Sequence, residues 1–97
     1  MRAIASIRDE TNQLALSGEL NFETIVSLWQ QSLPLLAKYP HIKIDLSEIT
    51  TSNSAGLALL IEWQKYAKRE NKQITFSNVP SQLQSIAAVA GVSLSYP

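Results

Sequence analysis

The chain has 97 residues, which is room for one domain with a single modest core. Eight basic residues balance eight acidic ones, so the net charge is zero and a broad basic surface for nucleic acid or anionic lipid is excluded. The absence of cysteine excludes disulfides and thiolate metal sites. No apolar run is long enough for a signal peptide or a membrane span, so we expect one soluble, cytosolic domain over residues 1–97.

The first forty residues predict a β-hairpin followed by a helix. Residues 3–8 and 13–17 alternate as strands around the polar turn 9–12, and Asn21 suits a helix N-cap. The helix is predicted from one apolar stripe at helical spacing, which we expect to face the core: Phe22, Ile25, Val26, Trp29, Leu33 and Leu36. Pro34 removes a helical N–H, which predicts a kink or an early end near Leu33.

In the second half, strands are predicted to alternate with helices. The predicted elements are a strand over 41–46, a polar turn over 47–53, a helix over 55–71, a strand over 73–77 and a third helix after Asn78-Val79-Pro80. The third helix should bury Leu83, Ile86, Ala87 and Ala90 and end at Gly91, and residues 92–97 are candidates for a short edge segment. The order ββαβαβα predicts an α/β fold in which a mixed sheet of about four strands carries three helices.

Ser54 lies where the third predicted strand leads into the second helix. One interpretation is structural: its hydroxyl caps the helix by accepting a backbone N–H. The other is functional, because a hydroxyl beside the positive end of a helix suits a regulatory phosphate or a partner contact. With Ser54 we group the neighbouring Asn53, Ala55 and Gly56 as candidate site residues.

The second helix carries more apolar surface than one core-facing stripe needs. Leu59, Trp63 and Tyr66 form a second apolar face beside the one that suits the sheet. Either neighbouring helices cover this face, or it is an exposed patch with aromatic anchors for a protein partner.

The residue types argue against catalysis. The only histidine, His41, begins the strand whose far end leads to Ser54, which is well beyond hydrogen-bond reach, so a serine hydrolase is excluded. Asp45 and Glu19 are expected to cap turns at strand ends. The glycines are too scattered for a phosphate-binding loop, and a single histidine does not make a metal site. We therefore expect no enzyme, no metal and no cofactor.

Two segments resemble the STAS domain family, the sulphate-transporter and anti-sigma-factor-antagonist modules. Residues 14–21 (LALSGELN), followed by Leu28-Trp29, resemble the start of such domains, and Asp45-Leu46-Ser47 with residues 53–57 (NSAGL) resemble the two later signatures. The segments LALSGEL and GLALL most resemble the corresponding segments of the small STAS subunits of Mla-type phospholipid-transport ABC complexes.

This resemblance implies a non-enzymatic module that binds a cytoplasmic protein. In the transporter branch the partner is the ATPase subunit of a complex that maintains outer-membrane lipid asymmetry, so the chain would lie at the inner membrane through its partner, without inserting into it. In the alternative branch, an anti-sigma-factor antagonist is regulated by phosphorylation of the hydroxyl that matches Ser54. Asn53 and Asn21 stand where the family has acids, and this loss of negative charge argues against kinase regulation. Nothing in the sequence predicts a homo-oligomer.

Overall fold

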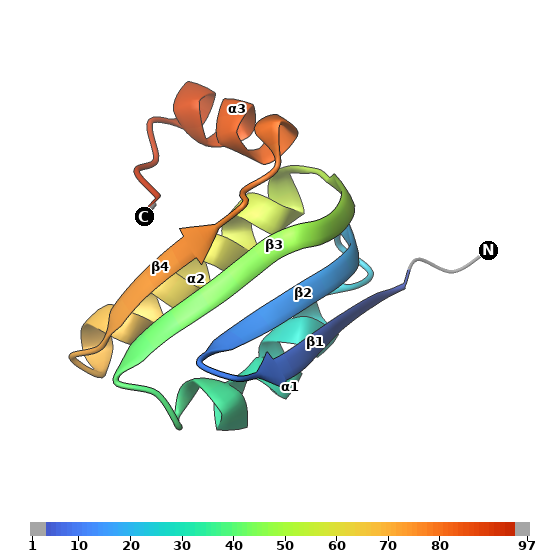
Figure 1. Cartoon of the computed structure of the whole chain (residues 1–97). Coiled ribbons are helices and arrows are strands. Elements are labelled where there is room, and N and C mark those ends of the chain that lie inside the picture. The colour runs from blue at the N-terminus through green and yellow to red at the C-terminus, as the bar shows by residue number, and fades with distance from the viewer. Residues whose placement is uncertain (1–3, 95–97) are drawn as a thin grey trace.

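A computed structural model describes residues 4–94 of the chain. Four strands form one mixed sheet in the order β1-β2-β3-β4, in which β1 and β2 are antiparallel and the other two pairs are parallel (Figure 1). The elements are β1 Ala5–Glu10, β2 Gln13–Leu20, α1 Ile25–Leu36, β3 His41–Ser52, α2 Ser54–Arg69, β4 Gln73–Ser77 and α3 Ser81–Ala90. The predicted order ββαβαβα and the α/β class are confirmed.

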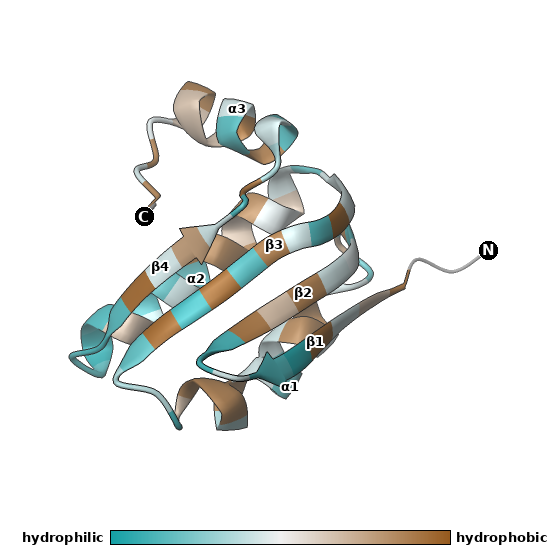
Figure 2. Ribbon diagram, in the orientation of Figure 1, coloured by the Kyte–Doolittle hydropathy of each residue, from teal (hydrophilic) through white to brown (hydrophobic). Residues whose placement is uncertain are grey.

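The helices cover one face of the sheet and leave the other open. In Figure 1, α1 and α2 lie behind the strands, and α3 sits beyond the strand ends at the top of the view. Figure 2 shows hydrophobic and hydrophilic residues alternating along β3. Ile42, Ile44 and Leu46 are fully buried, whereas Lys43 between them is exposed. The core therefore lies between the sheet and the helix pair, as expected for a strand with one solvated face.

β3 is longer than the sequence predicts, and the expected turn over 47–53 is wrong. The strand passes the end of β4 at Asp45 and stays paired with β2 as far as Ser52, opposite Leu20. The register of β3 against β2 shifts between the pair Ala15–Asp45 and the pair Ser17–Glu48. The Ser- and Thr-rich composition indicates a turn, but the extended β2 offers backbone partners that allow these residues to remain in a strand.

The face of α1 that meets the core is only partly the one predicted. Leu36 is fully buried and Ile25 and Trp29 pack against the core as expected, but Leu28 and Ser32 are also buried, while Phe22 and Val26, which were expected in the core, are 72% and 61% exposed. The early end near Leu33 is also wrong, because the helix continues to Leu36 with Pro34 inside it. Pro34 is on the exposed side, where the backbone carbonyl that loses its partner can bond to water.

α3 begins at Ser81 after Pro80 and ends at Ala90, and Gly91, which has a left-handed backbone, is its C-cap as predicted. Leu83 and Ala87 are buried as expected and Ile86 is partly buried, but Ala90 is exposed, so that part of the predicted face is wrong. Residues 92–94 form no strand, and the rest of the expected edge segment lies outside the described residues. Within residues 4–94, no helix has both the length and the hydropathy that crossing a membrane requires.

Candidate functional site

The first turn of α2 begins at the edge of the sheet where β2 and β3 end. Asn53, not Ser54, is the N-cap: its Oδ1 accepts the backbone N–H of Ala55 at 2.8 Å. The backbone N–H of Asn53 donates to the carbonyl of Leu20 at 3.2 Å, which fixes the cap to the end of β2. The structural role expected for Ser54 therefore belongs to its neighbour, and asparagine performs it as well as serine does.

Ala55 and Gly56 position this turn and do not form its outer surface. Both are buried, and a Cβ on Gly56 would lie 2.2 Å from the Ser52 hydroxyl and 3.1 Å from the Leu20 Cβ. A glycine is needed here because α2 starts directly against the ends of two strands. These predicted site residues hold the neighbouring Ser54 in place.

Ser54 is exposed, and its hydroxyl has no hydrogen-bond partner among residues 4–94. It also lies in an uncharged stretch, because no charged residue occurs between Glu48 and Glu62. With the cap supplied by Asn53, the Ser54 hydroxyl is available for contact with another molecule.

Trp63 is a core residue, so its expected role as an exposed anchor is wrong. Its side chain is fully buried, and the indole N–H donates to the Ser32 hydroxyl at 2.9 Å. That hydroxyl in turn donates to the carbonyl of Trp29 at 2.7 Å. Leu59 is also buried, at 3% exposure, and Tyr66 is only partly exposed. The structure thus supports the alternative that neighbouring elements cover this face of α2.

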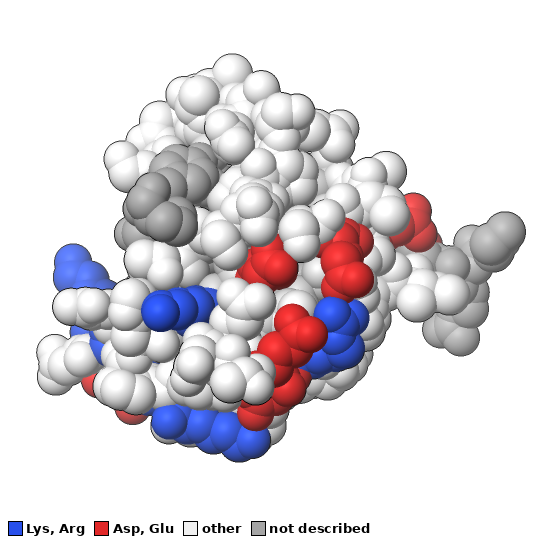
Figure 3. Space-filling view, in the orientation of Figure 1, with Lys and Arg blue, Asp and Glu red and all other residues white. Residues whose placement is uncertain are grey.

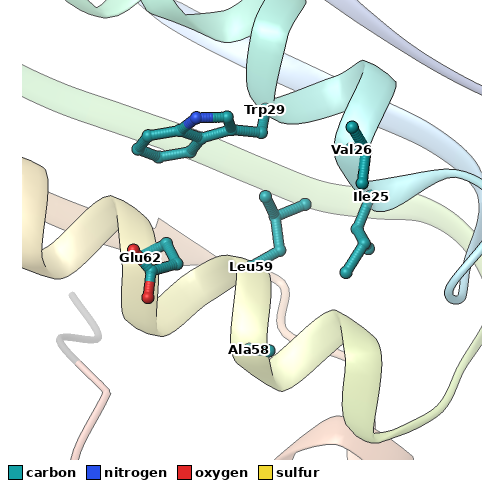
Figure 4. Close-up of a pocket in the computed structure, with 6 residues that line it drawn as sticks. All are labelled: Ile25, Val26, Trp29, Ala58, Leu59 and Glu62. Carbon is teal, nitrogen blue, oxygen red and sulfur yellow. The ribbon is translucent and has the colours of Figure 1, made fainter.

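The exposed apolar surface lies at Ala58, one position before the buried Leu59 on α2, and on the outer side of α1. A shallow groove of about 260 Å³ separates the two helices (Figure 4). Its lining residues are Ile25, Val26 and Trp29 from α1 and Ala58, Leu59 and Glu62 from α2. Trp29 is therefore half-buried at the groove, not wholly in the core as predicted. The sequence signal was present: residues 24–37 carry no charge at all, which is unusual for a helix with a solvated side.

The end of the molecule that carries Ser54 is also poor in charge. No charged residue follows Lys72 in the sequence, so α3 is entirely neutral. Figure 3 shows acidic and basic side chains on the open sheet face, whereas the region over α3 is white. α3 is tied to this end through Gln82, whose Oε1 accepts the backbone N–H of Ser52 at 3.4 Å, and it exposes Val89.

Asp45 forms a polar cluster on the open face of the sheet. Because β3 continues beyond it, Asp45 does not end a strand as predicted, but its carboxylate still orders the local chain. It accepts the Ser47 backbone N–H at 3.1 Å, the Ser47 hydroxyl at 2.9 Å and the Asn78 amide at 2.8 Å. Partial burial acts to raise the pKa of Asp45, but hydrogen bonds from Asn78 and Ser47 outweigh it, so the pKa lies below its usual value.

We predict a pH-dependent stability contribution from this cluster. The folded-state pKa is below the unfolded value of 3.8, so the ionised carboxylate stabilises the fold above that pH. The contribution is lost as the pH falls through the folded pKa. Asp45→Ala should therefore lower the free energy of unfolding by about 1–3 kcal/mol at pH 7, and by progressively less as the pH falls below 3.8 through the folded pKa. Urea unfolding over a series of pH values from 7 downwards checks this, and a loss that does not change with pH would contradict it.

His41 is far from Ser54, as the sequence predicts. It lies at the opposite end of β3, and its ring bonds to the Thr75 hydroxyl at 3.2 Å. The geometry around Ser54 therefore offers a surface for binding and no general base of this kind.

Comparisons with known proteins place these features in a family. A family model described as "Mlab, STAS domain" matches residues 4–93. The intermembrane phospholipid transport system binding protein MlaB of Escherichia coli (strain K12) is 31% identical over 74 residues, covering 76% of this chain and 74% of that protein. MlaB of Haemophilus influenzae is 31% identical over 84 residues, covering 82% and 80%.

Solved structures share the fold. The unphosphorylated anti-sigma factor antagonist SpoIIAA aligns with a TM-score of 0.70 at 11% identity, covering 92% of this chain and 82% of that chain. An anti-sigma factor antagonist from Mycobacterium paratuberculosis aligns with a TM-score of 0.73 at 20% identity, covering 93% and 79%. At these identities the likeness concerns the fold alone.

Proposed function

Because this chain belongs to the STAS domain family, and within it matches the MlaB model, we propose that it is a non-enzymatic adaptor in a phospholipid-transport system. Its partner in this proposal is the ATPase subunit of an ABC transporter that maintains outer-membrane lipid asymmetry. The chain would act in the cytoplasm, held at the inner membrane by that partner. The named MlaB relatives support the phospholipid-transport role, and the ATPase as partner is our inference.

The observation that carries the proposal is the exposed hydroxyl of Ser54, which has no hydrogen-bond partner among residues 4–94 and lies at the end of the molecule that the uncharged α3 covers. Two uncharged polar side chains, those of Ser54 and the capping Asn53, lie at the rim of this surface. Few charges need to be desolvated when such a surface is covered, which suits a stable subunit contact. The positive end of α2 also favours an acceptor group of the partner near Ser54.

Regulation would follow if the ATPase presented a better surface to the chain in one nucleotide state than in another. A partner that binds one state more tightly shifts the population towards it by the difference in binding free energy. The adaptor needs no catalytic group for this role.

The alternative function is that of an anti-sigma-factor antagonist switched by phosphorylation of Ser54. The fold likeness to such antagonists and the exposure of the hydroxyl favour it. The similarity to MlaB in sequence and the neutral Asn53 in place of an acid favour the transporter role.

Ser54→Asp should weaken binding of the purified ATPase subunit at least tenfold, or about 1.4 kcal/mol, because it buries a negative charge in a neutral contact. Thermal stability should barely change, since an acid in the first helical turn is favourable. Isothermal titration measures the affinity and calorimetry the melting temperature. Asn71→Asp is the matched control, because it adds the same charge at the far, exposed end of α2. Unaltered affinity of Ser54→Asp would count against this surface.

A further inference from the structure

The groove between α1 and α2 is continuous with the surface at Ser54. Ser54, Ala58 and Glu62 are spaced four residues apart on α2, so they follow one another along the same side of the helix. Ala58 and Glu62 line the groove, and Ser54 precedes them by one turn. Asn21, at the start of the turn before α1, precedes the groove on the other side, near the point where Asn53 bonds to Leu20.

The side chains that line the groove are mostly apolar, although the groove is open to solvent. Val26 in the lining is 61% exposed, and Figure 4 shows Trp29 and Leu59 turned towards the space between the helices. No charged residue lies between Glu23 and Lys38, so the outer side of α1 carries no charge. Contiguous exposed apolar groups of this kind mark an interaction surface.

The chemistry of the groove selects the kind of occupant. Side chains of two regular helices line it, and the backbone groups of those helices bond within each helix, so they offer no partner to an extended peptide. An occupant must therefore satisfy its own backbone hydrogen bonds, as an α-helix does. Among the described residues that line the groove, Glu62 is the only charged one, and its only ion pair within residues 4–94 is an exposed contact with Lys65 at 3.4 Å. A cation on the occupant can replace that weak contact.

We propose that this groove seats an amphipathic α-helix of the same ATPase partner, an inference that rests on the proposed function. One large apolar side chain of that helix lies between Val26, Trp29 and Ala58, and a lysine or arginine three or four residues away pairs with Glu62. A second copy of this chain fits less well, because its exposed apolar helices, α1 and α3, carry no cation to offer Glu62.

Two variants test the groove by titration of the purified ATPase subunit into the folded chain. Ala58→Trp fills the groove, and we expect at least a tenfold loss of affinity. Glu62→Lys reverses its only charge, and we expect at least a threefold loss that diminishes at high salt. The matched controls are Ala37→Trp and Glu70→Lys, which place the same side chains on exposed positions away from the groove and should bind like the wild type. Circular dichroism verifies that every variant is folded.

The possible outcomes distinguish a failure of the groove proposal from a failure of the proposed function. If Ser54→Asp weakens binding while Ala58→Trp and Glu62→Lys bind like the wild type, the groove proposal is overturned and the adaptor role stands. If the wild-type chain does not bind the ATPase at all, the proposed function is overturned. A dimer of the free chain that Ala58→Trp dissociates in analytical ultracentrifugation would assign the groove to a second copy and overturn the proposal. If Ala58→Trp fails to fold, Glu62→Lys decides alone.

Discussion

Trp63→Ala is expected to lower the free energy of unfolding by about 3–5 kcal/mol, the range for removing a large aromatic side chain from a core. Trp63 is fully buried, and its loss leaves a cavity between α2 and α1. It also removes the indole donor that the buried Ser32 hydroxyl accepts at 2.9 Å. A domain of this size is stable by roughly 5–10 kcal/mol, so the variant should be close to unfolding at 37 °C. Urea denaturation followed by far-UV circular dichroism measures the loss.

Tyr66→Ala is the matched control, because Tyr66 is an aromatic residue on the next turn of α2 that is only partly buried. Its replacement should cost clearly less stability than that of Trp63. A Trp63→Ala variant as stable as the wild type would mean that the indole is not a core group and would restore the exposed anchor that the sequence suggests.

Gly18→Ala should lower the free energy of unfolding by at least about 3 kcal/mol. Gly18 has a φ of +98°, and a Cβ there would lie 2.2 Å from the backbone carbonyl oxygen of Ile4. A backbone atom cannot rotate away as a side chain does. The substitution should therefore push β1 away from β2 and break the hydrogen bond from Glu19 N–H to the Ile4 carbonyl, 2.9 Å long. Chemical denaturation measures the change.

Gly91→Ala separates the steric effect from the backbone strain. Gly91 also has a positive φ, +71°, but a Cβ there meets nothing within 4 Å. We expect a loss of about 1–2 kcal/mol from the left-handed conformation alone. If the two variants lost equal stability, the close approach of β1 to Gly18 would not be the cause.

The order of elements was predictable because each segment carries a local signal. Residues 41–46 alternate with a period of two, and Gly91 ends an apolar helical pattern, as its left-handed backbone confirms. The extension of β3 to Ser52 was not predictable in this way. It depends on β2 lying alongside, a contact between residues some thirty positions apart that no local pattern contains.

The site was predicted only in part for a similar reason. Ser54 was recognised from its place before a helix, and the structure finds it exposed. The face of α2 that contacts the core was assigned from periodicity, which gives the spacing of a stripe but not the neighbour that covers it. Trp63 is covered because α1 turns Ser32 inward as its hydrogen-bond partner, and the same orientation of α1 leaves Val26 exposed. Ser32 has apolar residues three and four positions away on either side (Leu28, Trp29, Leu35 and Leu36), and a polar residue on such an apolar helix face is the signal that would have indicated this pairing.

We propose that this chain is a subunit-binding adaptor of a phospholipid transporter. The decisive experiment is affinity capture of the tagged chain from its own cells, with identification of the bound proteins by mass spectrometry. We predict recovery of an ABC ATPase together with its permease, and a marked loss of both with Ser54→Asp but not with Asn71→Asp. Recovery of a protein kinase and a sigma factor in their place would contradict the claim.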